Sequence, residues 1–192
     1  MKLYLINTYH REKEKKIKGY VSFLEELGVS PQVLDEDELY RVDGPVIISG
    51  SHKMVGNGEV SDRLREFIEE CRYPLLGICY GHQAMIRVLG GEVQRCKKYH
   101  KGREKIFRLK HHPLLETLGA EFFVEESHYE CVRKVPDEFE VLAISKDEED
   151  GEIIEVVSHR KSYLYGTQFH PERSGENGKI LMQNFLKLAG FS

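Results

Sequence analysis

The stretch "PLLGICYGHQAMIRVLGG" (residues 74–91) decides the fold, because an apolar run typical of a buried strand leads directly into a helical pattern. We expect the strand at 74–78 and the helix at 81–89, ended by two glycines. Between them, Gly77 and Gly81 flank Cys79 and relieve the crowding of a sharp turn. This layout predicts a nucleophile elbow, with a thiol where hydrolases carry serine. A core cysteine buried between a strand and a helix is the alternative.

Strand and helix patterns also alternate through the rest of the first half. Such alternation implies βαβ units and a parallel sheet. The expected strands are 2–6, 31–34 and 45–49, and the expected helices are 11–27, ended by Gly28, and 61–71, with Ser61 as N-cap.

The second half changes character, because apolar runs follow one another with short connections. These runs predict an antiparallel or mixed extension of the sheet, closed by a last helix at 178–189. No repeat or linker interrupts the chain, so we expect one α/β domain over residues 1–192. The expected strands of this half are 105–109, 121–126, 139–145, 152–158 and 163–169.

Composition is that of an ordinary globular protein. Hydrophobic residues make up 40% and charged residues 31% of the 192, and the formal net charge is −4. That charge is no footprint for nucleic acid. No apolar stretch approaches the roughly 20 residues of a membrane span, and the first apolar run is too short for a signal peptide. We therefore expect a cytoplasmic protein that binds neither nucleic acid nor membranes.

Three further features are read as structural. Cys71, Cys96 and Cys131 form no C-x-x-C pair, and no cysteine–histidine group has zinc-ligand spacing, so we expect no metal and no cofactor. The acidic turn 146–151 is expected to be solvated. The basic cluster 95–105 is expected to be a solvated loop, with a docking surface for an acidic or nucleotide-bearing partner as the alternative.

A reactive cysteine needs a base, and the base needs an orienting group. The segment "GTQFHPERSG" (166–175) supplies both, because His170 ends an apolar run and precedes Pro171, which favours extended backbone. In extended backbone, His170 and Glu172 point to the same side. The carboxylate is then placed to fix the imidazole tautomer. An exposed pair in a turn is the alternative, and the hypothesis requires that the strands before Cys79 and His170 run parallel and lie close.

The G-x-C-x-G-x-Q elbow followed by F-H-P-E at 169–172 resembles the class I (triad) glutamine amidotransferases over essentially the whole chain. The resemblance implies a flavodoxin-like three-layer fold. It also implies that Cys79 attacks the side-chain amide of L-glutamine, that His170 acts as general base and acid, and that Glu172 orients His170. A γ-glutamyl thioester forms, water releases glutamate, and ammonia passes to a synthase.

The resemblance extends to binding residues. Gln83, one helical turn after Cys79, is expected to contact the glutamine. The stretch "ESHYECV" (126–132) is similar to the family's S-H-x-x-x-V stretch, which implies that Ser127, His128 and Tyr129 hold the α-amino and α-carboxylate groups. The backbone N–H of Tyr80 is the expected first oxyanion donor.

The second oxyanion donor is expected from Gly50 or Ser51. The family has a G-G-P-like loop where this chain reads "SGSHK" (49–53). Serine adopts the backbone conformation required there only with strain, so the oxyanion hole is expected to form on substrate or partner binding. The alternative is that Gly50 alone gives enough freedom.

The elbow "GICYGHQ" resembles the free-standing glutaminase subunits of GMP synthases, although "INTYHREK" (6–13) replaces their D-N-G-G-Q-like turn. The tail 169–186 is also similar to glutaminase subunits of imidazole glycerol phosphate synthases, which usually carry Met at the position of His82. The chain leaves no room for an ATP-binding module, so a separate ATP-dependent synthase partner is expected. A stand-alone γ-glutamyl hydrolase and a non-catalytic regulatory module of the same fold are the alternatives.

Overall fold

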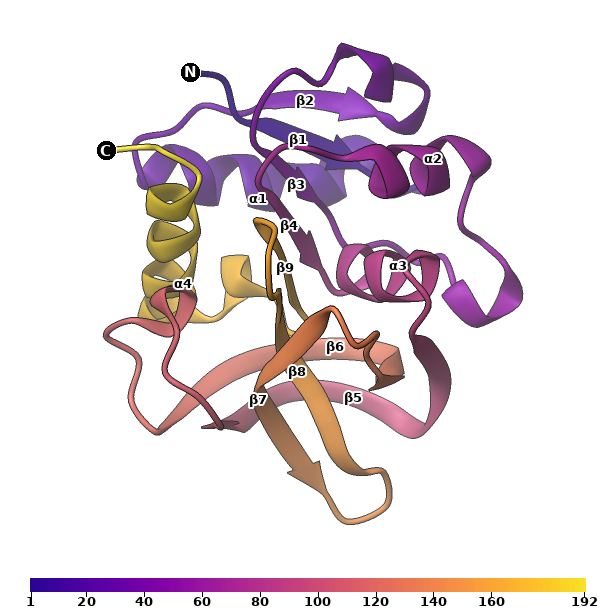
Figure 1. Cartoon of the computed structure of the whole chain (residues 1–192), viewed down its shortest axis with the longest axis vertical. Helices are drawn as coiled ribbons and strands as arrows, with labels where there is room; N and C mark the ends of the chain where they lie inside the picture. Colours follow the sequence, from indigo (N-terminus) through magenta and orange to yellow (C-terminus); the bar gives the residue numbers. More distant parts are fainter.

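The computed structural model describes all residues, 1–192. One sheet of nine strands runs through the molecule in the order β2-β1-β3-β4-β9-β8-β7-β5-β6 (Figure 1). Its two halves differ in strand direction, as the sequence predicts.

The first half of the sheet is parallel. It consists of β2 (Gln32–Asp35), β1 (Tyr4–Asn7), β3 (Val46–Ile48), β4 (Leu75–Ile78) and β9 (Leu164–Thr167). Counted in order of appearance, these strands have the 2-1-3-4-5 arrangement of flavodoxin-like folds. The expected fold class is therefore confirmed. In such sheets, ligands bind beyond the carboxyl ends of the strands.

The second half is antiparallel and contains the longer strands. It consists of β8 (Gly151–His159), β7 (Phe139–Asp147), β5 (Glu92–Arg108) and β6 (Glu121–Lys134). In Figure 1, β5 and β6 form a curved pair that passes beneath α3 and α4.

Four α-helices cover the two faces of the parallel half (Figure 1). α1 (Lys13–Glu26) and α4 (Gly175–Leu188) bury their apolar residues in one core cluster. α2 (Asp62–Glu70) and α3 (Tyr80–Val88) bury theirs in a second cluster on the opposite face. As predicted, the Ser61 side chain caps α2 by accepting from the Leu64 N–H at 3.1 Å. The result is a three-layer α/β/α arrangement with two cores.

Short 3-10 turns occupy several connections: Glu36–Arg41, Val55–Asn57, Pro113–Leu115 and Pro171–Arg173. No helix combines the length and apolar composition needed to cross a membrane.

Two local expectations are wrong. The cluster 95–105, expected as a solvated loop, belongs to strand β5, because it pairs with β6 over most of its length. The turn 146–151, expected to be solvated, contains a buried residue: Asp150 is only 8% exposed, since His100 and Arg133 contact its carboxylate. Both errors have one cause, since β6 pairs with the cluster and His100 and Arg133 reach Asp150 only through contacts between segments distant in sequence.

Candidate active site

Cys79 lies at a strained turn between β4 and α3. Its backbone has φ 52° and ψ −104°, which a residue with a Cβ rarely adopts. The flanking glycines are required by packing: a Cβ on Gly77 would lie 2.6 Å from the backbone of Gly81, and one on Gly81 would lie 2.5 Å from the carbonyl oxygen of Ile48. The sharp turn thus holds the thiol at the carboxyl end of β4, as the elbow pattern predicts.

Strand order brings His170 to the same edge. β4 and β9 are parallel neighbours, with Ile78 opposite Thr167, so the strand condition of the hypothesis is met. The N–H of Cys79 donates to the carbonyl of Thr167 at 2.8 Å. Beyond β9, the His170 N–H donates to the carbonyl of Glu125 in β6 at 3.0 Å. The backbone at His170 is therefore anchored to both halves of the sheet.

His170 and Glu172 form a buried pair. The imidazole Nδ1 lies 2.7 Å from Oε1 of Glu172, and each side chain is 3% exposed. Burial by itself lowers the pKa of His170, but the charges of Glu172 and of a Cys79 thiolate outweigh it and hold that pKa well above its ordinary value. Burial raises the pKa of Glu172, and the imidazolium more than reverses this, so that pKa lies below its ordinary value.

One cavity of about 260 Å³ unites the predicted residues. Cys79 and His170 both line it, and Nε2 of His170 is buried and has no hydrogen-bond partner. Glu172 lies behind His170 and does not line the cavity. The lining also includes most of the other predicted site residues, namely Ser51, Tyr80, Gln83, Ser127, His128 and Tyr129.

The oxyanion loop is built differently from the expectation. The N–H of Tyr80 belongs to the first turn of α3 and so has no intrahelical acceptor. The N–H of Gly50 donates to the hydroxyl of Tyr20 at 3.0 Å and is thus occupied. Ser51 is not among the residues with positive φ, so the expected strain is absent from this conformation. Its hydroxyl instead donates to the carbonyl of Thr8 at 2.9 Å and fixes the loop.

The expected binding residues differ in how free they are. The amide nitrogen of Gln83 donates to the carbonyl of Glu130 at 2.7 Å and to the side-chain oxygen of Gln168 at 3.1 Å. One ring nitrogen of His128 is occupied too: Nδ1 lies 2.8 Å from the carbonyl of Glu130, whereas Nε2 lies 3.0 Å from a carboxylate oxygen of Glu126 without a hydrogen bond to it.

Ser127 and Tyr129 are more accessible. The carbonyl of Ser127 lies 3.6 Å from the sulfur of Cys79, and its hydroxyl lies 2.6 Å from the hydroxyl of Tyr99. Tyr129 is 48% exposed and stacks on Tyr99, with ring centroids 4.1 Å apart. Ser127 and Tyr129 are therefore the residues of β6 whose groups are accessible from this cavity.

Sequence analysis missed two residues, Tyr20 and Gln168, that contact residues of the site. The hydroxyl of Tyr20 lies 3.5 Å from Nδ1 of His170 and also accepts the Gly50 N–H. The amide of Gln168 donates to the sulfur of Cys79 at 3.6 Å. Gln168 could have been suspected from its place two residues before His170. Tyr20 lies on the buried apolar face of α1, so its position in the sequence indicates only a core residue and not a contact with the site.

Comparison with solved structures agrees with this architecture. A protein of Thermoplasma acidophilum described as a GMP synthase subunit superposes with a TM-score of 0.83 at 24% identity, covering 98% of this chain and 94% of that chain. A glutamine amidotransferase of Thermotoga maritima superposes with a TM-score of 0.68 at 19% identity, covering 98% and 81%. These likenesses show the shared fold.

Sequence comparison goes further. The glutamine-hydrolysing GMP synthase subunit of Methanopyrus kandleri is 37% identical over 172 residues, which cover 84% of each chain. The protein of the same name from Pyrococcus furiosus is 34% identical over 158 residues, covering 82% of this chain and 81% of that one. The family model described as glutamine amidotransferase class-I matches residues 17–188. With this match and with the elbow, strand order and cavity described above, the chain belongs to the class I glutamine amidotransferase family.

Proposed function

We propose that this protein is the glutaminase subunit of a two-component amidotransferase of the GMP synthase type. The observation that carries the proposal is the single cavity lined by the thiol at the elbow and by an imidazole that a buried carboxylate braces at 2.7 Å. The names of the relatives from M. kandleri and P. furiosus, which describe glutamine-hydrolysing subunits, support the same assignment.

The first half-reaction forms a thioester. The raised pKa of His170 favours an imidazolium beside a Cys79 thiolate. The thiolate attacks the side-chain carbonyl carbon of glutamine, and the oxygen gains negative charge. The free N–H of Tyr80 is positioned to stabilise that oxygen. Collapse of the intermediate breaks the C–N bond, and His170 gives its proton to the departing nitrogen, which leaves as ammonia.

The second half-reaction restores the enzyme. Neutral His170 takes a proton from water, whose oxygen attacks the thioester carbonyl carbon. The C–S bond then breaks, glutamate leaves, and Cys79 returns to the thiolate beside an imidazolium. Glu172 stabilises the imidazolium each time it forms. When the ring is neutral, Glu172 fixes the tautomer that carries the proton on Nδ1.

Recognition of the glutamine backbone groups falls to the β6 side of the cavity. Ser127 and Tyr129 offer a carbonyl, a hydroxyl and an exposed ring there, whereas Nδ1 of His128 is held by the carbonyl of Glu130 and its Nε2 faces the buried carboxyl group of Glu126. We therefore assign His128 the role of holding β6 in place and assign direct contacts to Ser127 and Tyr129. Gln83, whose amide nitrogen donates to protein acceptors, positions the wall of the cavity.

The oxyanion loop suggests control by a partner. The Gly50 N–H is held by Tyr20 and so does not serve as a second donor, and the bond of the Ser51 hydroxyl to the Thr8 carbonyl fixes the loop in this conformation. Docking of a synthase subunit that receives the ammonia would reorganise this loop and complete the oxyanion hole. The isolated chain is then a weak glutaminase, and the complex is a fast one.

The test is glutamate release from L-glutamine, measured with the wild type, Cys79→Ala and the control Cys71→Ser, each with and without the synthase subunit encoded by the same genome. The proposal expects slow turnover by the isolated wild type, faster turnover in the complex, no turnover by Cys79→Ala, and wild-type rates for Cys71→Ser, since Cys71 lies at the end of α2 away from the cavity.

Two results would count against the proposal. Glutamate release that survives in Cys79→Ala would remove the thioester mechanism. Full activity of the isolated chain, unchanged by the synthase subunit, would favour a stand-alone γ-glutamyl hydrolase.

A further inference from the structure

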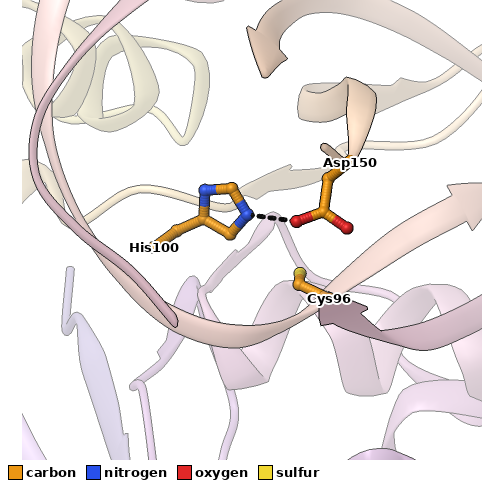
Figure 2. Close-up of side chains that lie close together, drawn as sticks. All are labelled: Cys96, His100 and Asp150. Carbon is orange, nitrogen blue, oxygen red and sulfur yellow. Dashed lines mark hydrogen bonds and ion pairs between the residues drawn. The ribbon is translucent and has the colours of Figure 1, made fainter. Parts of the chain in front are cut away.

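A second cluster of reactive side chains lies outside the cavity. Cys96, His100 and Asp150 are all buried, and their sulfur, ring-nitrogen and carboxylate-oxygen atoms lie within 4.8 Å of one another (Figure 2). None of the three lines the cavity with Cys79. The cluster therefore needs an explanation apart from glutamine hydrolysis.

The donor types match a zinc site. Structural zinc is held by thiolate, imidazole and, less often, carboxylate ligands in a tetrahedron. Cys131 is the fourth donor nearest to this group: its sulfur lies 2.6 Å from that of Cys96 and would have to move towards His100 and Asp150 to complete the tetrahedron. Two thiolates with one imidazole and one carboxylate favour zinc over the oxygen-seeking magnesium and calcium ions.

The surroundings of Asp150 fit a bound cation. One carboxylate oxygen faces His100 at 2.7 Å, while the other accepts from the Lys97 N–H at 2.9 Å and from Arg133 at 3.0 Å. The oxygen that contacts His100 would turn to the metal when Nε2 of His100 also binds it, and the other oxygen is held in place by partners beyond the ligands, as in known zinc sites. Zinc with two thiolates and a carboxylate carries one net negative charge, and the guanidinium of Arg133 neutralises it.

The ligands come together only through strand pairing. β5 and β6 lose regular register between Arg95 and His100, and this irregularity turns Cys96 towards Cys131 on the neighbouring strand. Asp150 arrives from the turn between β7 and β8. No local spacing of cysteines and histidines could reveal such a site, because its ligands lie on three separate segments.

We propose that Cys96, Cys131, His100 and Asp150 form a structural zinc site. Binding releases the two thiol protons to solvent and moves the proton of His100 from Nε2 to Nδ1, which frees Nε2 for the metal. The two sulfurs must separate, since zinc–sulfur bonds of about 2.3 Å place tetrahedral thiolates about 3.7 Å apart. The ion would tie the irregular part of β5 to β6 and to the β7–β8 turn.

The site would support the wall of the catalytic cavity without entering it. Tyr99, between two of the ligands in sequence, contacts the Ser127 hydroxyl at 2.6 Å and stacks on Tyr129. A metal-held β5 therefore fixes the side chains that shape the exposed part of the cavity. All four protein ligands fill the tetrahedron, so no open position remains for catalysis.

The experiment uses the full chain, purified reduced and without an affinity tag. Zinc chloride is added, the unbound zinc is removed, and the bound zinc is measured by elemental mass spectrometry. Cobalt chloride is then added to metal-free protein, because tetrahedral thiolate ligation gives cobalt visible bands and a near-ultraviolet sulfur-to-cobalt transition. We expect about one zinc ion per chain and both spectral signatures, which zinc then displaces.

Variants locate the ion. Cys96→Ser, His100→Asn and Asp150→Asn should each weaken zinc binding by at least about 10- to 100-fold, whereas the control Cys71→Ser should bind like the wild type. In the wild type, zinc should raise the thermal midpoint and a chelator should reverse that rise. This last measurement needs no variant, so misfolding of a substituted chain does not obscure the result.

Three outcomes would overturn the proposal. The first is a reduced wild type that takes up no zinc and gives cobalt no sulfur-to-metal transition. The second is equal metal binding by the wild type and the three ligand variants. The third is an alkylation assay of the freshly purified, denatured chain that finds only two of the four cysteines free, with no uptake of zinc after reduction, because the Cys96–Cys131 contact would then belong to a disulfide.

Discussion

Nδ1 of His170 lies 2.7 Å from Oε1 of Glu172, and both side chains are buried at the carboxyl edge of the sheet. The chain separates them only by Pro171, so this contact is local. The approach of His170 to the cavity of Cys79 is not local, since it depends on β9 pairing with β4. The site therefore rests on one contact within a short segment and on one between distant strands.

Glu172→Gln should lower kcat for glutamate release by roughly 10³- to 10⁴-fold, by analogy with amide substitution in serine-protease triads. The amide keeps the shape of the side chain but removes the charge that raises the pKa of His170. That pKa should fall, and the imidazolium–thiolate pair should become less populated at neutral pH. Steady-state kinetics over a range of pH would measure both effects. Glu176→Gln, at an exposed position of α4, is the matched control, and equal losses in the two variants would contradict an orienting role for Glu172.

Ser51→Gly should raise the glutaminase activity of the isolated chain several-fold and narrow the difference between the isolated chain and the complex. The substitution removes the bonds of the Ser51 hydroxyl to the Thr8 carbonyl and the Lys53 N–H and frees the backbone of the loop. Ser51→Ala separates the two effects, because it removes the same bonds but keeps the Cβ. Turnover of both variants should be measured with and without the synthase subunit. An isolated Ser51→Gly chain no faster than the wild type would argue against this loop as the source of low activity.

Gly81→Ala should reduce the free energy of unfolding by about 1–3 kcal/mol, because the added methyl group would overlap the carbonyl of Ile48 in a rigid strand. Gly19→Ala is the matched control: nothing lies within 4 Å of its Cβ position, and it is exposed within α1. It should stabilise the protein by about 0.5–1 kcal/mol, since alanine favours helix. Urea unfolding would measure both. A Gly81→Ala protein as stable as the wild type would mean that the elbow is looser than described.

Glu126→Gln should flatten the dependence of stability on pH near neutrality. Burial raises the pKa of Glu126 to about 7, and burial together with the charge of Glu126 holds the pKa of Glu155 well above its ordinary value. Because the folded pKa is raised, the native state binds more protons than the unfolded state between about pH 4.5 and 7. Stability is therefore fully present below that window and is lost as the pH rises through about 7.

Thermal midpoints of the wild type and Glu126→Gln between pH 5 and 8 test this sign. The variant should lose less stability across the range, and Glu148→Gln, at an exposed position, should follow the wild type. A wild type that becomes more stable from pH 5 to 8 would reverse the prediction.

Much of the parallel half of the fold could be predicted from local patterns. Apolar runs and helical periods marked β4 and α3, and the glycines around Cys79 marked the turn between them. The structure adds the reason for those glycines, since neither Gly77 nor Gly81 has space for a Cβ. Ser61 could be recognised as a cap because capping depends on a few neighbouring atoms.

The antiparallel half was harder to predict. Residues 92–104 carry charged side chains and few apolar ones, yet they form most of β5. Their strand conformation is stabilised by pairing with β6, a partner that lies outside any local window. Asp150 was misjudged for the same reason, because only the folded arrangement brings His100 and Arg133 to its carboxylate.

By itself, the sequence determined the chemical groups of the site and the turns that present them: the thiol between two glycines, and the histidine two residues before a glutamate. Only the tertiary structure decided that β9 lies beside β4, that Tyr20 occupies the Gly50 amide, and that Cys96 meets Cys131. The physical reason is the distance along the chain over which each kind of interaction acts. Turn geometry and side-chain period act over a few residues, whereas contacts between distant strands depend on the free energy of packing the whole sheet.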